Sequence, residues 1–240
     1  MLLWNIAVLC GSFIKGLCGV GDAPVYSAIL AFAHNNIDIN PVNAILSLPV
    51  NIFIAYQNRK GLNRSIWIPL SAVIIAGSIT GTILLKNADT RVLKTAFGFF
   101  IILIGIVMLA NELSPKKIKP SKAALAAIGL LAGLSCGLFG VGILLVVYIS
   151  QTTENMRQFK ANICMVFAIE NTVRIILLSV LGILTLETAV KAFSLFPCLA
   201  VGLFLGIKCA GKLDERKARI IVMIMLTLSG VAIAATNIFG

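Results

Sequence analysis

Residues 16–26 read GLCGVGDAPVY and residues 137–142 read GLFGVG, so one glycine-rich phrase occurs twice, about half the chain apart. The glycines of the two copies correspond at one constant offset: Gly16, Gly19 and Gly21 match Gly137, Gly140 and Gly142. The first copy continues with Asp22 and Pro24, where the second has Ile143 and Leu145. Glycine releases the backbone from helical geometry, and proline suits the first turn of a new helix. Each phrase therefore predicts a break within a long apolar helix.

The composition places these helices in lipid. The chain has 240 residues, of which 59% are hydrophobic and 12% charged, and its mean hydropathy is +1.02. Soluble domains are about half apolar and a quarter charged. The apolar runs approach the roughly 20 residues that cross a hydrocarbon core, and they lack the alternation of barrel strands. The sequence therefore predicts an all-α polytopic membrane protein.

The phrase belongs to a longer repeat. Each half has one long broken segment and three ordinary spans, which we place at 2–33, 44–57, 65–86 and 95–113, and at 123–150, 163–181, 190–210 and 220–239. Further matches follow in order: Val50-Asn51 with Glu170-Asn171, and Gly77-SIT-Gly81 with Gly202-LFL-Gly206. GxxxG spacing lets helix backbones approach closely. We interpret 1–113 and 123–240 as two repeats, joined by a cytoplasmic linker, SPKKIKPSK, at 114–122.

The distribution of lysine and arginine orients the repeats. If both long segments are simple spans, eight basic loop residues lie on the linker side and ten on the other. If both are hairpins that return to their own side, fourteen lie on the linker side and four opposite. Cytoplasmic loops carry the excess of basic residues. The pattern favours two inverted repeats, each a broken glycine-rich helical hairpin plus three transmembrane helices. It also accounts for the net charge of +11 without nucleic acid.

Four ionisable residues fall inside apolar segments, where they are functional candidates: Lys15, Asp22, Glu170 and Arg174. Glu170 and Arg174 are four residues apart, so on a helix they can simply neutralise each other. Alternatively, the planar fork of Arg174 binds an oxyanion, and protonation of the competing Glu170 couples to binding. Three interpretations of Lys15 and Asp22 stay open. The two residues form a structural pair, or Lys15 extends to the membrane interface. In the third, Lys15 binds the anion and Asp22 carries the coupling proton.

Backbone and amide groups complete the predicted site. Inverted-repeat transporters place their substrate near the midplane, where the amino ends of half-helices point at an anion. We therefore assign substrate binding also to four glycines of the breaks, Gly19, Gly21, Gly140 and Gly142. Asn51 and Asn171, which occupy equivalent places in the two repeats, either bind the substrate or form hydrogen bonds between helices. The single histidine, His34, lies in HNNIDINPVN and is interpreted as an ordinary loop residue.

Three phrases resemble the sulfite exporter TauE/SafE family, also called the toluene sulfonate uptake permeases: GLCGVGDAPVYSAIL at 16–30, NPVNAILSLPVNIFIAY at 40–56 and FKANICMVFAIENTVRI at 159–175. The resemblance covers essentially the whole chain and implies transport of sulfite, sulfonates or similar small anions. It also favours Asn171 and Arg174 as site residues. The chain departs from the family pattern at Asp22 and Ala23, where glycines are usual, and at 143–145, where small residues and proline are usual.

The residues favour a secondary transporter, coupled to protons or to the membrane potential, over other classes. No ATP-binding motif is present, and one histidine with scattered acids argues against an enzyme, so no metal or cofactor is expected. Two alternatives stay open: a thiosulfate-type transporter with a thiol relay through Cys18 or Cys136, and an anion channel. The expected partners are a small anion and the lipid bilayer of a bacterial plasma or inner membrane, with a homo-oligomer left open.

Overall fold

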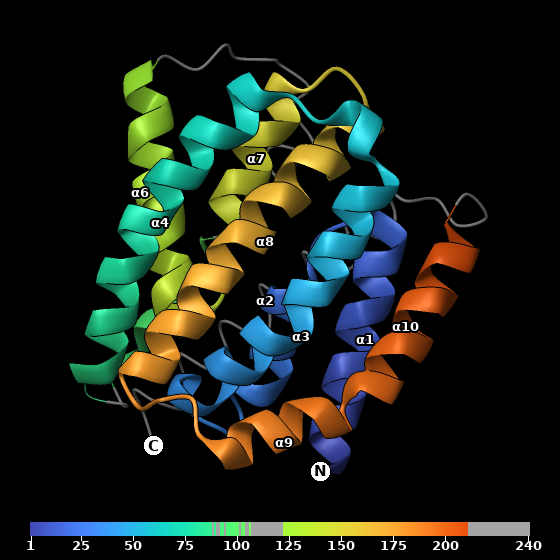
Figure 1. Cartoon of the computed structure of the whole chain (residues 1–240). Coiled ribbons are helices and arrows are strands. Elements are labelled where there is room, and N and C mark those ends of the chain that lie inside the picture. Colours follow the sequence, from blue (N-terminus) through green and yellow to red (C-terminus); the bar gives the residue numbers. More distant parts are fainter. Residues whose placement is uncertain are drawn as a thin grey trace.

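The computed structural model describes residues 1–87, 89, 92–93, 95–100, 102–103, 106 and 122–210, and it is built from helices (Figure 1). The first half contains α1 (Leu2–Cys18), α2 (Asp22–Leu30), α3 (Asn36–Gln57), a short 3₁₀ helix η1 (Arg59–Gly61) and α4 (Arg64–Asn87). The second half contains α6 (Lys122–Phe139), α7 (Ile143–Thr152), α8 (Met156–Val180), α9 (Leu186–Ser194) and α10 (Phe196–Cys209). The span expected at 220–239, most of the linker and most of 95–113 lie outside the described residues.

Three helices of the described chain, α3, α4 and α8, are long and apolar enough to cross a membrane. They correspond to the spans expected at 44–57, 65–86 and 163–181. However, α3 begins at Asn36 and α8 at Met156, seven or eight residues before the expected starts. Their first turns are polar, and Asn155 caps α8 by accepting a hydrogen bond from the Gln158 backbone N–H at 2.9 Å. Hydropathy marks only the apolar part of a helix, so it missed these turns.

The span expected at 190–210 is a bent pair rather than one straight helix. Helices α9 and α10 meet at Leu195 with a bend of 41° and pass the length and hydropathy test only together. Pro197 stands in the first turn of α10. Proline lacks the backbone N–H that a continuous helix requires, and it is well accommodated where a helix begins. This local preference explains why the chain restarts there.

Both predicted breaks are confirmed. Helix α1 ends at Gly19 with a φ of 84°, and α2 begins directly after Gly21 with a φ of 103°. In the second half Gly140, with a φ of 72°, separates α6 from α7. These are left-handed conformations, which glycine adopts without the steric penalty of a Cβ.

The first broken segment folds back on itself. Ser12 Oγ of α1 lies 3.1 Å from Tyr26 Oη of α2. Trp4 Nε1, near the start of α1, donates to His34 Nε2, after the end of α2, at 2.9 Å. Because early residues of α1 contact late residues of α2, the two helices run antiparallel. The chain therefore returns to the end of the molecule from which it started (Figure 1).

Glycines hold the two halves together at two places. Helix α4 packs on α6, and a Cβ placed on Gly133 would lie 2.9 Å from the Cα of Gly77. Helix α10 packs on α1, and a Cβ on Gly16 would lie 3.0 Å from the Cα of Gly206. Both contacts involve a GxxxG pair from one half and the broken segment of the other. The expected close approach of helix backbones at these motifs is confirmed.

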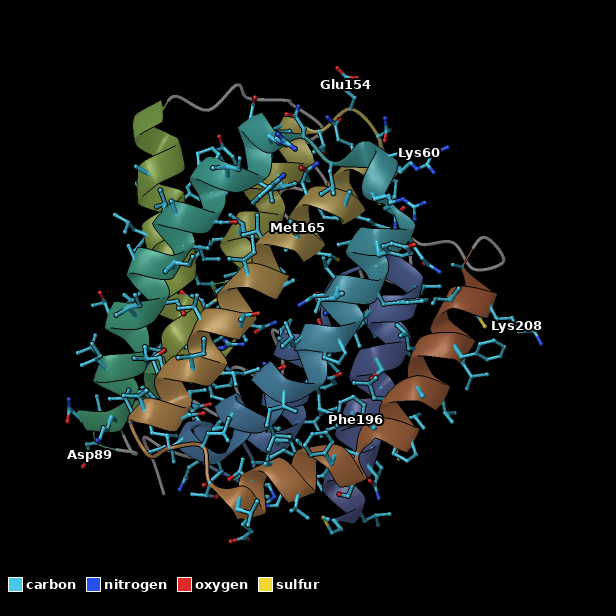
Figure 2. All side chains as sticks on the ribbon, in the orientation of Figure 1. Lys60, Asp89, Glu154, Met165, Phe196 and Lys208 are labelled. Atoms are coloured by element: carbon cyan, nitrogen blue, oxygen red, sulfur yellow. The ribbon has the colours of Figure 1, made fainter. Side chains whose placement is uncertain are left out.

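Helices α3 and α8 lie side by side in the centre and run in opposite directions (Figure 1). The loop after α3 contacts α8 at one end of the molecule, where the Asn63 backbone N–H donates to Asn162 Oδ1 of α8 at 2.9 Å. Asn162 Nδ2 in turn donates to the Gly61 carbonyl at 3.0 Å. Lys60 and Glu154 lie at this end, and Asp89 and Phe196 lie at the opposite end (Figure 2). The fold thereby brings the α3–α4 and α7–α8 loops to the same side.

Candidate functional site

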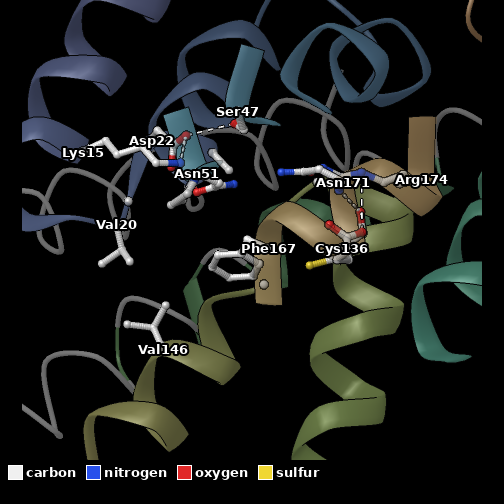
Figure 3. Close-up of a pocket in the computed structure, with 16 residues that line it drawn as sticks. Lys15, Val20, Asp22, Ser47, Asn51, Cys136, Val146, Phe167, Asn171 and Arg174 are labelled. Carbon is white, nitrogen blue, oxygen red and sulfur yellow. Dashed lines mark hydrogen bonds and ion pairs between the residues drawn. The ribbon is translucent and has the colours of Figure 1, made fainter. Parts of the chain in front are cut away.

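The two glycine breaks lie around one cavity with about 410 Å³ of empty space (Figure 3). Helices α1, α2 and α3 line it from the first half, and α6, α7 and α8 line it from the second. Its lining includes all four of the predicted buried charges, and it is completed by small and apolar residues: Val20, Ala23, Pro24, Val146 and Phe167. A break in a helix leaves backbone N–H and C=O groups without partners inside that helix, and the two breaks place such groups around the cavity.

The first charge pair joins the two sides of the first break. Lys15 Nζ, at the end of α1, lies 2.7 Å from Asp22 Oδ2, in the first turn of α2. Both side chains are buried, with 4% and 8% of their surfaces exposed. Ser47 Oγ of α3 lies 2.9 Å from the same carboxylate oxygen and 2.9 Å from Asn43 Oδ1. The single hydroxyl proton of Ser47 can be donated to one of these two acceptors at a time.

The second charge pair lies within α8. Arg174 Nε is 3.5 Å from Glu170 Oε1, and both side chains are almost fully buried. Arg174 Nη1 donates to the Cys136 carbonyl of α6 at 2.7 Å, and Nη2 donates to Asn171 Oδ1. Glu170 Oε1 also accepts a hydrogen bond from Ser78 Oγ of α4 at 2.7 Å. The guanidinium is thus held in place by groups from α6 and α8.

Helix α3 of the first half supports the break of the second half. Asn40 Nδ2 donates to the Gly137 carbonyl at 2.7 Å, and Asn43 Nδ2 donates to the Gly140 carbonyl at 3.1 Å. These carbonyls belong to the end of a helix and lack partners within it. Together with Ser47, Asn43 therefore connects the Asp22 carboxylate to the backbone of the second break.

Two polar atoms of the cavity lining have no hydrogen-bond partner among the described residues, Arg174 Nε and Asn51 Oδ1. A buried donor or acceptor without a partner costs about 1–3 kcal/mol. The formal charges of the lining balance, with Lys15 and Arg174 against Asp22 and Glu170. An arrangement of this kind can accept a small oxyanion at the Arg174 Nε–H once Glu170, its ion-pair partner, is neutralised.

The amino ends of the two short helices differ in charge. Helix α2 carries Asp22 in its first turn, whereas α7 carries no acidic residue in its first turn. The amino end of a helix bears a partial positive charge. Asp22 offsets this charge at α2, so the amino end of α7 has the more favourable field for an anion.

The structure brings together nine of the ten residues that the sequence predicts for substrate binding or proton coupling. The exception is Gly19, which does not line the cavity. A Cβ on Gly19 would lie 2.9 Å from Cε of Lys160, so the stem of this lysine covers the turn. The contacts place these residues around one cavity; their roles in transport stay predictions.

Sequence reasoning missed Ser47, Asn43 and Ser78. A signal for the first two was present, because Asn40, Asn43, Ser47 and Asn51 recur at helical spacing along an otherwise apolar helix. Ser78 carried no comparable signal, since it follows Gly77 within a plain packing motif. Its partner Glu170 is 92 residues away, and only the docking of α4 on α8 joins them.

The fold and the cavity define a class of protein. Large apolar side chains such as Leu2, Val180 and Phe204 are 76%, 78% and 65% exposed, while four charged side chains of the described residues are buried inside. This inversion is typical of a helical protein embedded in a membrane. The family model of the sulfite exporter TauE/SafE matches residues 4–233, and the chain belongs to this family. No curated protein and no solved structure matches the chain.

Proposed function

We propose that this protein is a secondary transporter of small organic or sulfur-containing anions, such as sulfite or a sulfonate, in a bacterial plasma or inner membrane. The proposal rests on one observation above others: a buried Arg174, in a cavity between two helix breaks, whose Nε–H is ion-paired with Glu170 but makes no hydrogen bond. Membership of a family named for sulfite export supports the choice of substrate.

Arg174 is the principal anion ligand in this proposal. Its guanidinium is already fixed by Cys136 and Asn171, so little side-chain entropy is lost when an oxyanion binds. Lys15, the Asn51 amide and the backbone at Gly140 and Gly142 surround the same space. A sulfonate or sulfite offers several oxygens on one centre, and several donors can therefore bind it at once.

Protonation of the acidic residues is the proposed coupling step. An anion that approaches Arg174 is repelled by Glu170, and protonation of Glu170 removes this repulsion. At the first break, protonation of Asp22 weakens its pairing with Lys15 and leaves Ser47 to donate to Asn43. Asn43 holds the Gly140 carbonyl, so the charge state of Asp22 reaches the second break through three contacts: Asp22 with Ser47, Ser47 with Asn43, and Asn43 with Gly140.

Alternating access follows if the halves are inverted repeats that rock against each other. The paths of α3 and α8 are opposite in Figure 1, as are those of α1 and α6 and of α4 and α10. The contacts between halves are also reciprocal, since α4 packs on α6 and α10 packs on α1. These features support the inverted-repeat interpretation of the sequence.

The test is sulfite uptake into proteoliposomes by the wild type and by Arg174→Lys. The lysine retains the charge but not the planar fork, so we expect a fall in uptake of roughly 10²-fold with little change in melting temperature. Arg157→Lys is the matched control, because Arg157 is exposed at the end of the molecule and does not line the cavity. Unaltered uptake by Arg174→Lys would reject the assignment of the anion site.

Two alternative functions give different results in the same assay. Cys136 lines the cavity and Cys18 does not, so a thiol relay predicts that Cys136→Ser stops uptake of thiosulfate. The proposed mechanism predicts that this variant remains active. A channel predicts flux without saturation or counterflow, and the transporter predicts both.

A further inference from the structure

An open groove with about 560 Å³ of empty space lies between the end of α3 and the first half of α8. Among the described residues its lining is apolar apart from Arg59 and the Tyr56 hydroxyl: Ile52, Ala55, Tyr56, Arg59, Leu62, Met165 and Ala168. Met165 marks its position on the helix α8 side in Figure 2. From Ile52 to Arg59 the lining follows the chain for about two helical turns, or roughly 10 Å.

This groove lies on the outer side of the α3–α8 pair. Asn51 faces the charged cavity and is 2% exposed, whereas the next residue, Ile52, is 53% exposed. Tyr56, one turn further along α3, is 65% exposed. In a membrane-embedded protein, exposed apolar side chains of this kind face lipid. The groove is therefore separate from the proposed substrate site and open to the bilayer.

One end of the groove carries positive charge. The central carbon of the Arg59 guanidinium lies 4.5 Å from the centre of the Tyr56 ring, within the range of a cation–π contact. A guanidinium has five N–H donors, and a contact with a ring face does not use them as hydrogen bonds. Lys60 and Arg64 flank the same loop, and the Gly61 backbone lies against that of Arg157. The α3–α4 loop is tied to α8 through Asn162, which fixes Arg59 above the apolar lining.

We propose that this groove binds an anionic phospholipid, with an acyl chain along the lining and the phosphate at Arg59. The combination of an apolar slot and a cation at its end matches the two parts of such a lipid. Basic pockets between transmembrane helices bind anionic head groups, and arginine donates two parallel hydrogen bonds to a phosphate. A neutral lipid would satisfy only the slot, and a second copy of this basic face would bring like charges together.

Native mass spectrometry of the full chain in detergent tests the proposal, with phosphatidylglycerol and phosphatidylcholine of identical acyl chains as probes. The wild type should bind one phosphatidylglycerol about fivefold to tenfold more tightly than phosphatidylcholine. Arg59→Gln should abolish this difference. Arg64→Gln, which changes a nearby exposed arginine outside the lining, should retain most of it.

A variant that fills the slot tests the acyl chain separately. Ala168 lines the groove and is 6% exposed, and Ala168→Phe should reduce binding of both lipids. A melting curve of each variant is the control that tests whether the fold is retained. Equal binding of the two lipids by the wild type would overturn the proposal, as would equal losses in Arg59→Gln and Arg64→Gln. A lipid-free dimer would assign this face to a second copy instead.

Discussion

Replacement of Glu170 by glutamine tests the coupling mechanism most directly. Glu170 Oε1 lies 3.5 Å from Arg174 Nε, so an anion bound to that N–H would lie close to the carboxylate. At roughly 5 Å and an effective dielectric constant of about 20, two unit charges repel by about 3 kcal/mol. Removal of this repulsion corresponds to a Kd for the anion that is lower by roughly 10²-fold. We therefore expect Glu170→Gln to bind sulfite more tightly at neutral pH.

Glutamine is nearly isosteric with glutamate, so this variant removes the negative charge at position 170 and changes little else. The fold should survive, since the glutamine carbonyl can still accept the hydrogen bond from Ser78.

Isothermal titration of the purified protein with sulfite at one neutral pH provides the measurement. Glu187→Gln is the control, because Glu187 is exposed on α9 and is not part of the cavity lining. A Glu170→Gln protein that binds sulfite no more tightly than the wild type would refute the electrostatic reasoning.

Three further results are expected. Asp22→Ala should destabilise the protein by about 3–5 kcal/mol because Lys15 is left buried and unpaired. The double variant with Lys15→Met should regain much of this loss. Thermal unfolding in a double-mutant cycle measures the coupling between the two residues, and additive losses would contradict the pairing. Gly140→Ala should be more harmful to uptake and melting temperature than Gly182→Ala: both glycines are left-handed, but only a Cβ at Gly140 meets a neighbour, 2.7 Å from Asn43 Nδ2. Single cysteines introduced at 157 and 191 of a cysteine-free chain should react with an impermeant reagent from opposite sides of the membrane, and reaction from one side for both would exclude the hairpin topology.

The breaks and the helix contacts could be predicted because they depend on local properties. The absence of a Cβ permits the left-handed φ of Gly19, Gly21 and Gly140, although Gly142, the equivalent of Gly21, has a φ of −108°. Close packing at Gly77 and Gly206 likewise follows from small residues at helical spacing. Helix starts were harder, because the polar first turns of α3 and α8 are helical without being apolar. Hydropathy responds to side chains, whereas capping and backbone hydrogen bonds decide where a helix begins.

The candidate site shows the same division between local and long-range information. The sequence by itself determined the broken helices, the apolar spans and which ionisable residues enter the membrane region, since composition and spacing along one chain carry these. Only the tertiary structure decided that Lys15 pairs with Asp22 instead of snorkelling, and that Asn43 holds the second break. It also decided that Lys160 covers Gly19. These contacts join residues on different helices, and several different dockings can bury the same apolar faces equally well.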